Sequence, residues 1–209
     1  MLATNIRVAP GLALPFFPMR PAEGRSLSTP DRAVELVREF EESGDTLQPK
    51  LNGDRACVAV VRASHLLPSD VQFFKPLVVG KVAVLVQNRH GDRYHYSIAN
   101  LSLFARLPPG TCQDGEVFKK QFYPFETLAS EGISMLRSAP DGRVANARAV
   151  CRMLGVDWLF DAPKLAYLRL HRENLPFWEG IVRKAKGSPY VPCTNDTCDS
   201  PTWWKHKWS

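Results

Sequence analysis

Short apolar segments bounded by glycine or polar turns run along most of the chain, and two of them are rich in valine. This pattern predicts β-strands. The strands are expected at residues 46–50, 55–62, 81–88, 112–118, 121–127, 164–170 and 178–184, and residues 203–208 are expected to be extended. Pro49 confines the first strand to a sheet edge or a strand end, because proline cannot donate a ladder hydrogen bond.

Helical spacing marks three other segments. The first lies between Thr29, which can serve as its N-cap, and Gly44, which can end it. Its apolar stripe consists of Ala33, Val34, Leu36, Val37 and Phe40. A second helix is expected within residues 98–106 and a third at residues 142–154, closed by Gly155.

Many strands with few helices, and no regular strand–helix alternation, favour an α+β fold built on antiparallel sheets. Residues 1–28 show no period and are rich in proline, glycine and arginine, so we expect an irregular arm that packs on the surface. Residues 29–209 are expected to form one domain, which suits a chain of 209 residues.

Composition and charge narrow the class of protein. The chain is 44% hydrophobic and 23% charged, and its apolar runs are strand-sized, far short of a membrane span. The N-terminus lacks the features of a secretory signal. We therefore expect a cytoplasmic protein, of a bacterial or phage-like host, or a nuclear one, and neither a secreted nor a membrane protein. The net charge of +6 is compatible with a polyanionic partner.

The five cysteines are odd in number and irregularly spaced, which favours free thiols in a reducing cytosol. Cys193 and Cys198 are the only close pair, and together with His206 they could supply zinc ligands. No second cysteine pair accompanies them, so free thiols are the expectation.

The first segment with candidate chemistry is Lys50-Leu51-Asn52-Gly53-Asp54-Arg55. A lysine at the end of a strand and before a turn can present its amine over a cleft. The amine is a nucleophile only when deprotonated, which burial or nearby cations favour. Taken alone, the segment is more typical of a surface hairpin.

Residues suited to a nucleoside-triphosphate site follow in order along the chain. Arg55 and Arg89 can donate to ribose hydroxyls or phosphates, and Glu116 can accept from a ribose hydroxyl or hold a metal. Phe125 offers a stacking face for a purine. Glu179 can coordinate a divalent cation, which prefers oxygen ligands.

Three lysines near the end of the chain complete this series. Lys184, Lys205 and Lys207 can neutralise phosphates and favour the deprotonated amine of Lys50. Each residue of the series also has an ordinary explanation, as a surface charge, a core aromatic or part of a solubilising tail. Because all these residues occur together and in one order along the chain, the ordinary explanations are less satisfactory.

Six motifs carry the order, at residues 50–55, 88–91, 107–116, 122–128, 179–184 and 203–207. They resemble the motifs of ATP-dependent DNA ligases, in the superfamily of covalent nucleotidyltransferases that also includes RNA ligases and mRNA capping enzymes. The first is similar to Lys-x-Asp-Gly-x-Arg, the third to Leu-Pro-x-Gly-Thr-x-x-Asp-Gly-Glu, the fifth to Glu-Gly-x-Val-x-Lys and the last to Trp-x-Lys-x-Lys. The third motif and Ser188-Pro189-Tyr190 favour DNA ligases over capping enzymes.

The resemblance implies a nucleotidyltransferase fold, ATP-grasp-like, with antiparallel sheets and helices that enclose a nucleotide cleft. It implies that Lys50 takes AMP from ATP, and that AMP then passes to the 5′-phosphate of nicked duplex DNA before a 3′-hydroxyl seals the nick. Gln48 would read the adenine and Phe125 would stack on it. Magnesium or manganese, held by Glu179 and Glu116, would offset charge.

Two departures from the family pattern leave alternatives open. Asn52 replaces the usual aspartate and carries no charge. The chain ends two residues after Lys207, so no OB-fold domain is expected. Either the chain is a minimal or excised catalytic domain, or it works with a separate OB-fold or clamp partner. The alternative functions are a non-catalytic nucleic-acid-binding relative, an RNA ligase and a capping-type guanylyltransferase.

Overall fold

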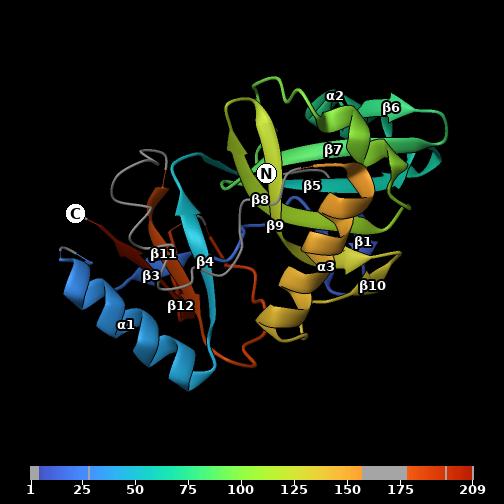
Figure 1. The fold of residues 1–209 in the computed structure, drawn as a ribbon. Coiled ribbons are helices and arrows are strands. Elements are labelled where there is room, and N and C mark those ends of the chain that lie inside the picture. The colour runs from blue at the N-terminus through green and yellow to red at the C-terminus, as the bar shows by residue number, and fades with distance from the viewer. Residues whose placement is uncertain (1–4, 28, 157–177, 196, 209) are drawn as a thin grey trace.

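The computed structural model describes residues 5–27, 29–156, 178–195 and 197–208. Two large β-sheets dominate this part of the chain, and helices lie on their outer sides (Figure 1). The strand expected at residues 164–170 falls outside the described residues. No helix among them is long and apolar enough to cross a membrane.

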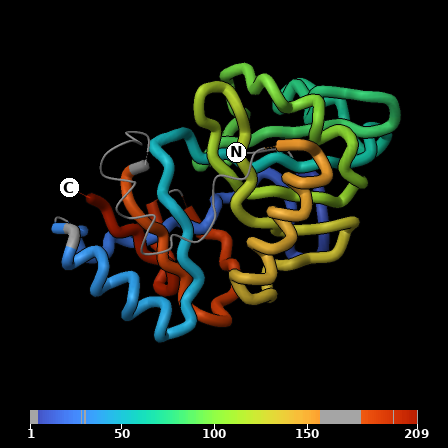
Figure 2. The backbone as a smooth tube through the Cα atoms, in the orientation of Figure 1, coloured from blue at the N-terminus to red at the C-terminus, as the bar shows by residue number. Residues whose placement is uncertain are grey.

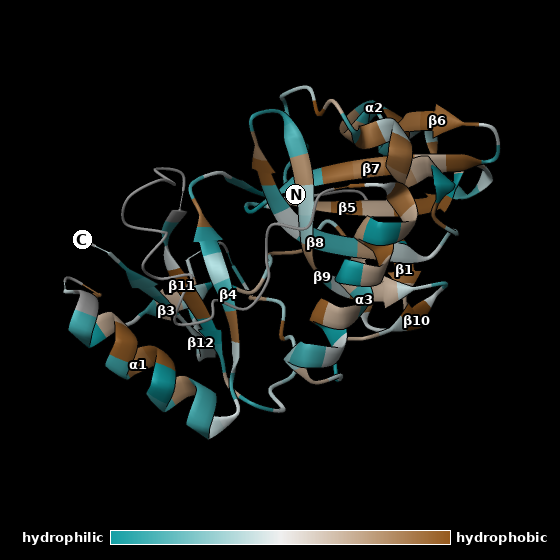
Figure 3. Cartoon of the chain, viewed as in Figure 1, coloured by the Kyte–Doolittle hydropathy of each residue, from teal (hydrophilic) through white to brown (hydrophobic). Residues whose placement is uncertain are grey.

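The larger sheet has six strands, and every neighbouring pair in it is antiparallel. Its order is β10 (Ile133–Ser134), β9 (Gln121–Ser130), β8 (Thr111–Phe118), β5 (Asp54–Arg62), β7 (Val82–Asn88) and β6 (Leu77–Val79). Strands β5 and β7 are buried on both faces, which accounts for their runs of valine (Figure 3). Helix α3 (Pro140–Leu154) covers one face and α2 (Pro68–Phe74) lies near β6.

The smaller sheet has four strands, in the order β3 (Pro21–Glu23), β12 (Ser200–Lys207), β11 (Trp178–Lys184) and β4 (Thr46–Leu51). Only the β3–β12 pair is parallel. Strand β4 is at the sheet edge, as Pro49 predicts. Helix α1 (Pro30–Ser43) packs its apolar stripe on one face of this sheet, with the Thr29 hydroxyl capping its first turn and Gly44 ending it.

The prediction of an irregular surface arm at residues 1–28 is wrong for the described part of that segment. Strands β1 (Ile6–Ala9) and β2 (Leu12–Leu14) form a hairpin whose apolar side chains enter the core of the larger sheet. Strand β3 joins the smaller sheet beside β12. Figure 2 shows the blue N-terminal chain running between the two sheets. These strands are too short to show a period, and contacts with distant segments hold them.

Two further expectations are corrected. The helix expected within residues 98–106 is a 3₁₀ helix at Leu101–Arg106. Cys193 and Cys198 are joined as a disulfide, so the prediction that the cysteines are unbridged is wrong for this pair and holds for the buried Cys57, Cys112 and Cys151. Within the described residues no three metal-ligating side chains come together, so the zinc set with His206 does not form.

Candidate active site

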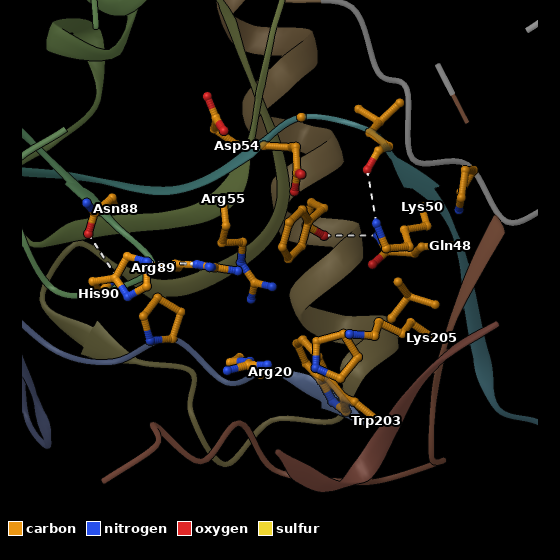
Figure 4. Close-up of a pocket in the computed structure, with 18 of the residues that line it drawn as sticks. Arg20, Gln48, Lys50, Asp54, Arg55, Asn88, Arg89, His90, Trp203 and Lys205 are labelled. Carbon is orange, nitrogen blue, oxygen red and sulfur yellow. Dashed lines mark hydrogen bonds between the residues drawn. The ribbon is translucent and has the colours of Figure 1, made fainter. Parts of the chain in front are cut away.

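A cavity of about 540 Å³ is lined by residues of both sheets (Figure 4). Eight of the ten site residues expected from the sequence line it: Gln48, Lys50, Arg55, Arg89, Glu116, Phe125, Lys184 and Lys205. Strand alternation explains the grouping, because Gln48 and Lys50 point to the same face of β4, and Trp203 and Lys205 to the same face of β12. Residues more than a hundred positions apart thus share one cavity.

The amine of Lys50 contacts the carboxylate of Glu179, which lies outside the lining. The side chain of Lys50 is 21% exposed, so the amine can be reached from the cavity. Lys50 Nζ also lies 3.4 Å from the carbonyl oxygen of Leu51. The expected nucleophile and the expected metal ligand are therefore in contact with each other.

Lys184 lies deepest among the cations of the cavity, with its side chain only 1% exposed. Its Nζ donates to Gln48 Oε1 and lies 3.0 Å from the Glu126 carboxylate. Gln48 in turn donates from Nε2 to the Phe125 carbonyl oxygen, at 3.1 Å. Burial lowers the pKa of Lys184 to about 8, although the Glu126 carboxylate acts to raise it.

Glu126 has a second cationic neighbour behind the cavity. Arg143 Nε, on α3, lies 3.4 Å from its carboxylate, and both side chains are fully buried. The Arg143 guanidinium also donates to the carbonyl oxygens of Ser138 and Ser188. A buried ionic cluster of Lys184, Glu126 and Arg143 thus joins the smaller sheet, the larger sheet and α3.

Arg55 is held by a second buried carboxylate. Its Nε donates to Asp114 Oδ1 at 2.6 Å, and its Nη2 donates to Oδ2 of the same group and to the Met19 carbonyl oxygen at 3.1 Å. The guanidinium carbon lies 4.6 Å from the centre of the Phe125 ring. Burial acts to lower the pKa of Arg55, but the Asp114 carboxylate outweighs it. The pKa of Arg55 is therefore raised well above its ordinary value.

Glu116 is the neighbour of Arg55 across the β5–β8 pair. Burial raises the pKa of Glu116 to about 7, although the Arg55 and Lys50 cations act to lower it. Gly53 allows the close approach of these strands, since a Cβ there would lie 2.8 Å from Glu116 Cγ and 2.5 Å from the Val117 carbonyl oxygen.

Arg89 lies in the turn that follows β7, within the motif at residues 88–91. The side chain of Asn88 accepts from the amides of His90 and Asp92, and Gly91 has a φ of +76°, so this turn has a defined shape. Arg89 Nε lies 2.9 Å from His90 Nε2. The turn carries both Arg89 and His90 to the cavity.

The two lysines of the last motif have different positions. Lys205 lines the cavity and its Nζ lies 2.7 Å from the Glu23 carboxylate. Lys207 lies outside the lining, at the end of β12, where it is paired in register with Gly180 of β11. A Cβ on Gly180 would lie 1.9 Å from the His206 carbonyl oxygen, so only glycine fits at this crossing of the two strands.

No family model matches the chain, and no curated protein matches it. Solved structures do resemble it. Mycobacterial DNA ligase D complexed with ATP and MES has a TM-score of 0.54 and 16% identity, covering 92% of this chain and 60% of that one. The ligase domain of LigD from M. tuberculosis has a TM-score of 0.56 and 16% identity, covering 92% and 59%.

The chain has the fold of the mycobacterial LigD ligase domain. The expected α+β class, with antiparallel sheets and few helices, is confirmed by this LigD-like fold. The chain spans about three fifths of the length of the two solved chains, at 60% and 59%.

In this LigD-like fold, several cavity residues have partners that were not among the expected site residues. They are Asp114, Glu126, Arg143 and Tyr190, all of them buried. Asp114, Glu126 and Tyr190 belong to quoted motifs, so their residue types are visible in the sequence. The roles of Glu126 and Arg143 depend on a meeting of α3, β9 and β11, which no local pattern reveals.

Two carboxylates were expected to hold a divalent metal, and they belong to different sheets. Glu179 faces Lys50, whereas Glu116 lies beside Arg55 on the other sheet. Among the described residues no group of three metal-ligating side chains occurs. This donor set fits a magnesium or manganese ion that takes one carboxylate from the protein and its other oxygens from phosphates and water.

Proposed function

We propose that this chain is the nucleotidyltransferase domain of an ATP-dependent DNA ligase, in which Lys50 takes AMP from ATP. The observation that carries the proposal is the convergence of eight expected site residues, from both sheets, on one cavity. A solved protein with the same fold is complexed with ATP, which supports ATP as the ligand of this cavity.

In this proposal Lys50 Nζ attacks the α-phosphorus of ATP. A nitrogen–phosphorus bond forms, the bond from that phosphorus to the bridging oxygen breaks, and pyrophosphate leaves. The amine must first lose a proton, and Glu179 is the carboxylate that contacts it. Lys205 and Lys184 add positive charge to the cavity, which stabilises the charge that grows on the phosphate oxygens.

The remaining lining residues suit the nucleoside. Phe125 and Val182 line the cavity from opposite sheets and could enclose a flat base. Gln48 lies between Lys184 and the Phe125 backbone, which fixes its amide at that end. Glu116 could accept a hydrogen bond from a ribose hydroxyl. Glu179 would hold a divalent ion that, when bound, offsets phosphate charge.

The substitution at position 52 does not remove a carboxylate from this cavity. Asn52 is exposed in its turn and is not part of the lining, whereas Asp54, two residues on, is. Asp54 accepts from the Tyr94 hydroxyl at 3.3 Å. This placement favours a catalytic chain over a non-catalytic relative that keeps only the fold.

We further propose that the AMP passes to the 5′-phosphate of nicked duplex DNA, whose 3′-hydroxyl then attacks and releases it. The DNA ligase fold and the ligase motifs support this substrate. An OB-fold or clamp unit would hold the duplex. Comparing nicked DNA with nicked RNA in a sealing assay separates a DNA ligase from an RNA ligase.

The decisive experiment is covalent labelling with α-labelled ATP and magnesium or manganese. The wild-type chain should acquire label, and Lys50→Ala should lose it because the proposal assigns the bond to the Lys50 amine. Lys81→Ala is the matched control, since Lys81 is exposed and distant from the cavity lining, and it should label normally.

An unlabelled wild-type protein that still binds DNA in a salt-sensitive way would establish the non-catalytic alternative. Preferential competition by GTP would establish a guanylyltransferase.

A further inference from the structure

Part of the N-terminal segment forms one wall of the cavity. Pro18, Arg20 and Pro21 line it, although no motif expected from the sequence lies there. We propose that Arg20 binds a phosphate group of the substrate, as a binding residue additional to those predicted. The inference rests on the proposed function in taking the cavity as the site of nucleotide and nicked-end chemistry.

The wall is fixed to the rest of the site through Met19. The Met19 amide donates to the Tyr190 hydroxyl at 3.1 Å, and its carbonyl oxygen accepts from Arg55 at 3.1 Å. Tyr190 in turn donates to Asp114 at 2.8 Å, and Asp114 accepts from Arg55. These four residues form a closed ring of hydrogen bonds, so the backbone next to Arg20 is held in place.

The other side of Arg20 is fixed as well. Its carbonyl oxygen accepts from the Ser200 amide at 2.7 Å, and Pro21 is in register with Ser200 where β3 joins β12. The prolines at 18 and 21 restrict the backbone on both sides. A side chain on such a segment loses little backbone freedom when it binds a ligand.

The ion pair of Arg20 with Asp199 is longer than the ion pairs of Lys184 and Lys205. Its Nε lies 3.6 Å from Asp199, and the two side chains are 31% and 46% exposed. Exposed pairs of this kind contribute little. By contrast, Lys184 and Lys205 lie 3.0 and 2.7 Å from their carboxylates. A phosphate could therefore compete with Asp199 for the guanidinium of Arg20.

The chemistry of the surroundings indicates an anion. Six lysines and arginines line the cavity against two carboxylates, those of Asp54 and Glu116. Figure 4 shows the Arg20 guanidinium among the lining residues, between His90 and Trp203 in the view. The planar guanidinium matches two oxygens of a phosphate, which makes arginine suited to this ligand.

The phosphate could belong to the triphosphate of a free nucleotide or to the 5′-end of a nick, and two measurements separate these sources. The first is calorimetric binding of inorganic tripolyphosphate to the full chain. The second is binding of a nicked duplex with a 5′-phosphate compared with the same duplex without it. Neither requires catalysis, so both can be read even if Lys50 forms no adduct.

Arg20→Gln should weaken one of these interactions at least about tenfold, the loss expected for a charge-assisted hydrogen bond. Arg7→Gln is the matched control, because Arg7 is an exposed arginine of the same N-terminal segment outside the lining. Arg20→Lys should recover part of the loss, because lysine restores the positive charge but cannot donate two parallel hydrogen bonds to a phosphate.

A loss confined to tripolyphosphate assigns Arg20 to the triphosphate, and a loss confined to the phosphorylated nick assigns it to the nucleic acid. If Arg20→Gln binds both probes as Arg7→Gln does, the inference is overturned. Labelling of Lys50 by ATP is tested separately. A wild-type chain that takes no label but binds polyphosphate through Arg20 would contradict the proposed function and not this inference.

Discussion

The two sheets that meet at the cavity differ in how many of their faces are apolar. In the six-stranded sheet, alternate residues of β5 enter separate apolar clusters, with Ala56, Val58 and Val60 on one face and Ala59 and Val61 on the other. The four-stranded sheet has one apolar face, against α1, and presents lysines to the cavity from the other. The larger sheet is thus mainly a scaffold, whereas the smaller one carries Lys50, the nucleophile that we propose.

The buried cluster of Lys184, Glu126 and Arg143 is where these two sheets depend on each other. Breaking it should have the largest effect on stability. Arg143→Met removes one of the two cations that face Glu126 and leaves the carbonyl oxygens of Ser138 and Ser188 without this donor. We expect the free energy of unfolding to fall by about 4 kcal/mol, as for other buried pairs that lose a partner.

Urea unfolding monitored by tryptophan fluorescence measures this loss. Arg152→Met is the control, because Arg152 is an exposed arginine on the same helix, and it should change stability by no more than about 0.5 kcal/mol. Equal effects of the two substitutions would show that the cluster does not join the sheets energetically.

The contrast between the sheets also explains what the sequence could predict. The expected strands of the larger sheet and the helix between Thr29 and Gly44 depend on local features, namely runs of valine, an N-cap and a glycine end. Helix α2 and strand β6 were missed because each is short, at seven and three residues. The N-terminal strands were missed because their pairing partners lie elsewhere in the chain.

The site divides in the same way. Lys50, Glu116 and Lys184 belong to motifs in which residue type and spacing are visible in one chain. The wall that carries Arg20 shows no such motif, and the partners Glu126 and Arg143 acquire their roles only through folding. Sequence order thus predicted which side chains meet in the cavity, and not what holds them there.

A second test concerns the cavity face of the smaller sheet. Folding lowers the pKa of Lys184 to about 8, so between about pH 8 and about pH 10.5 the unfolded chain binds more protons than the folded one. The contribution of Lys184 to stability should therefore rise with pH over this range, by up to about 3 kcal/mol.

Lys184→Met should remove this rise, as followed by urea unfolding at several pH values. Lys186→Met, an exposed lysine just beyond the same strand, should keep it. A rise that persists in Lys184→Met would mean that another group titrates, and that the smaller sheet does not hold a desolvated amine.

A third test concerns Glu116, on the larger sheet, where the expected effect has the opposite sign. Folding raises the pKa of Glu116 to about 7 from its ordinary 4.5. The folded state then binds more protons between these values, so the stability that Glu116 contributes is present below about pH 4.5 and is lost as pH rises through about 7. Glu116→Gln should flatten this decline, and Glu42→Gln, an exposed glutamate on α1, should not.

The decline due to Glu116 and the rise due to Lys184 add together. Their joint contribution to the free energy of unfolding should be smallest between about pH 7 and about pH 8. In that interval Glu116 has lost its proton and Lys184 still keeps its own, so both desolvated charges are present on facing walls of the cavity. A ligand that supplies a partner to each, a hydroxyl for one and a phosphate for the other, should therefore stabilise the protein most near this minimum. Unfolding midpoints measured with and without ATP across the pH range test this directly. A stabilisation by ATP that does not vary with pH would mean that the ligand contacts neither group.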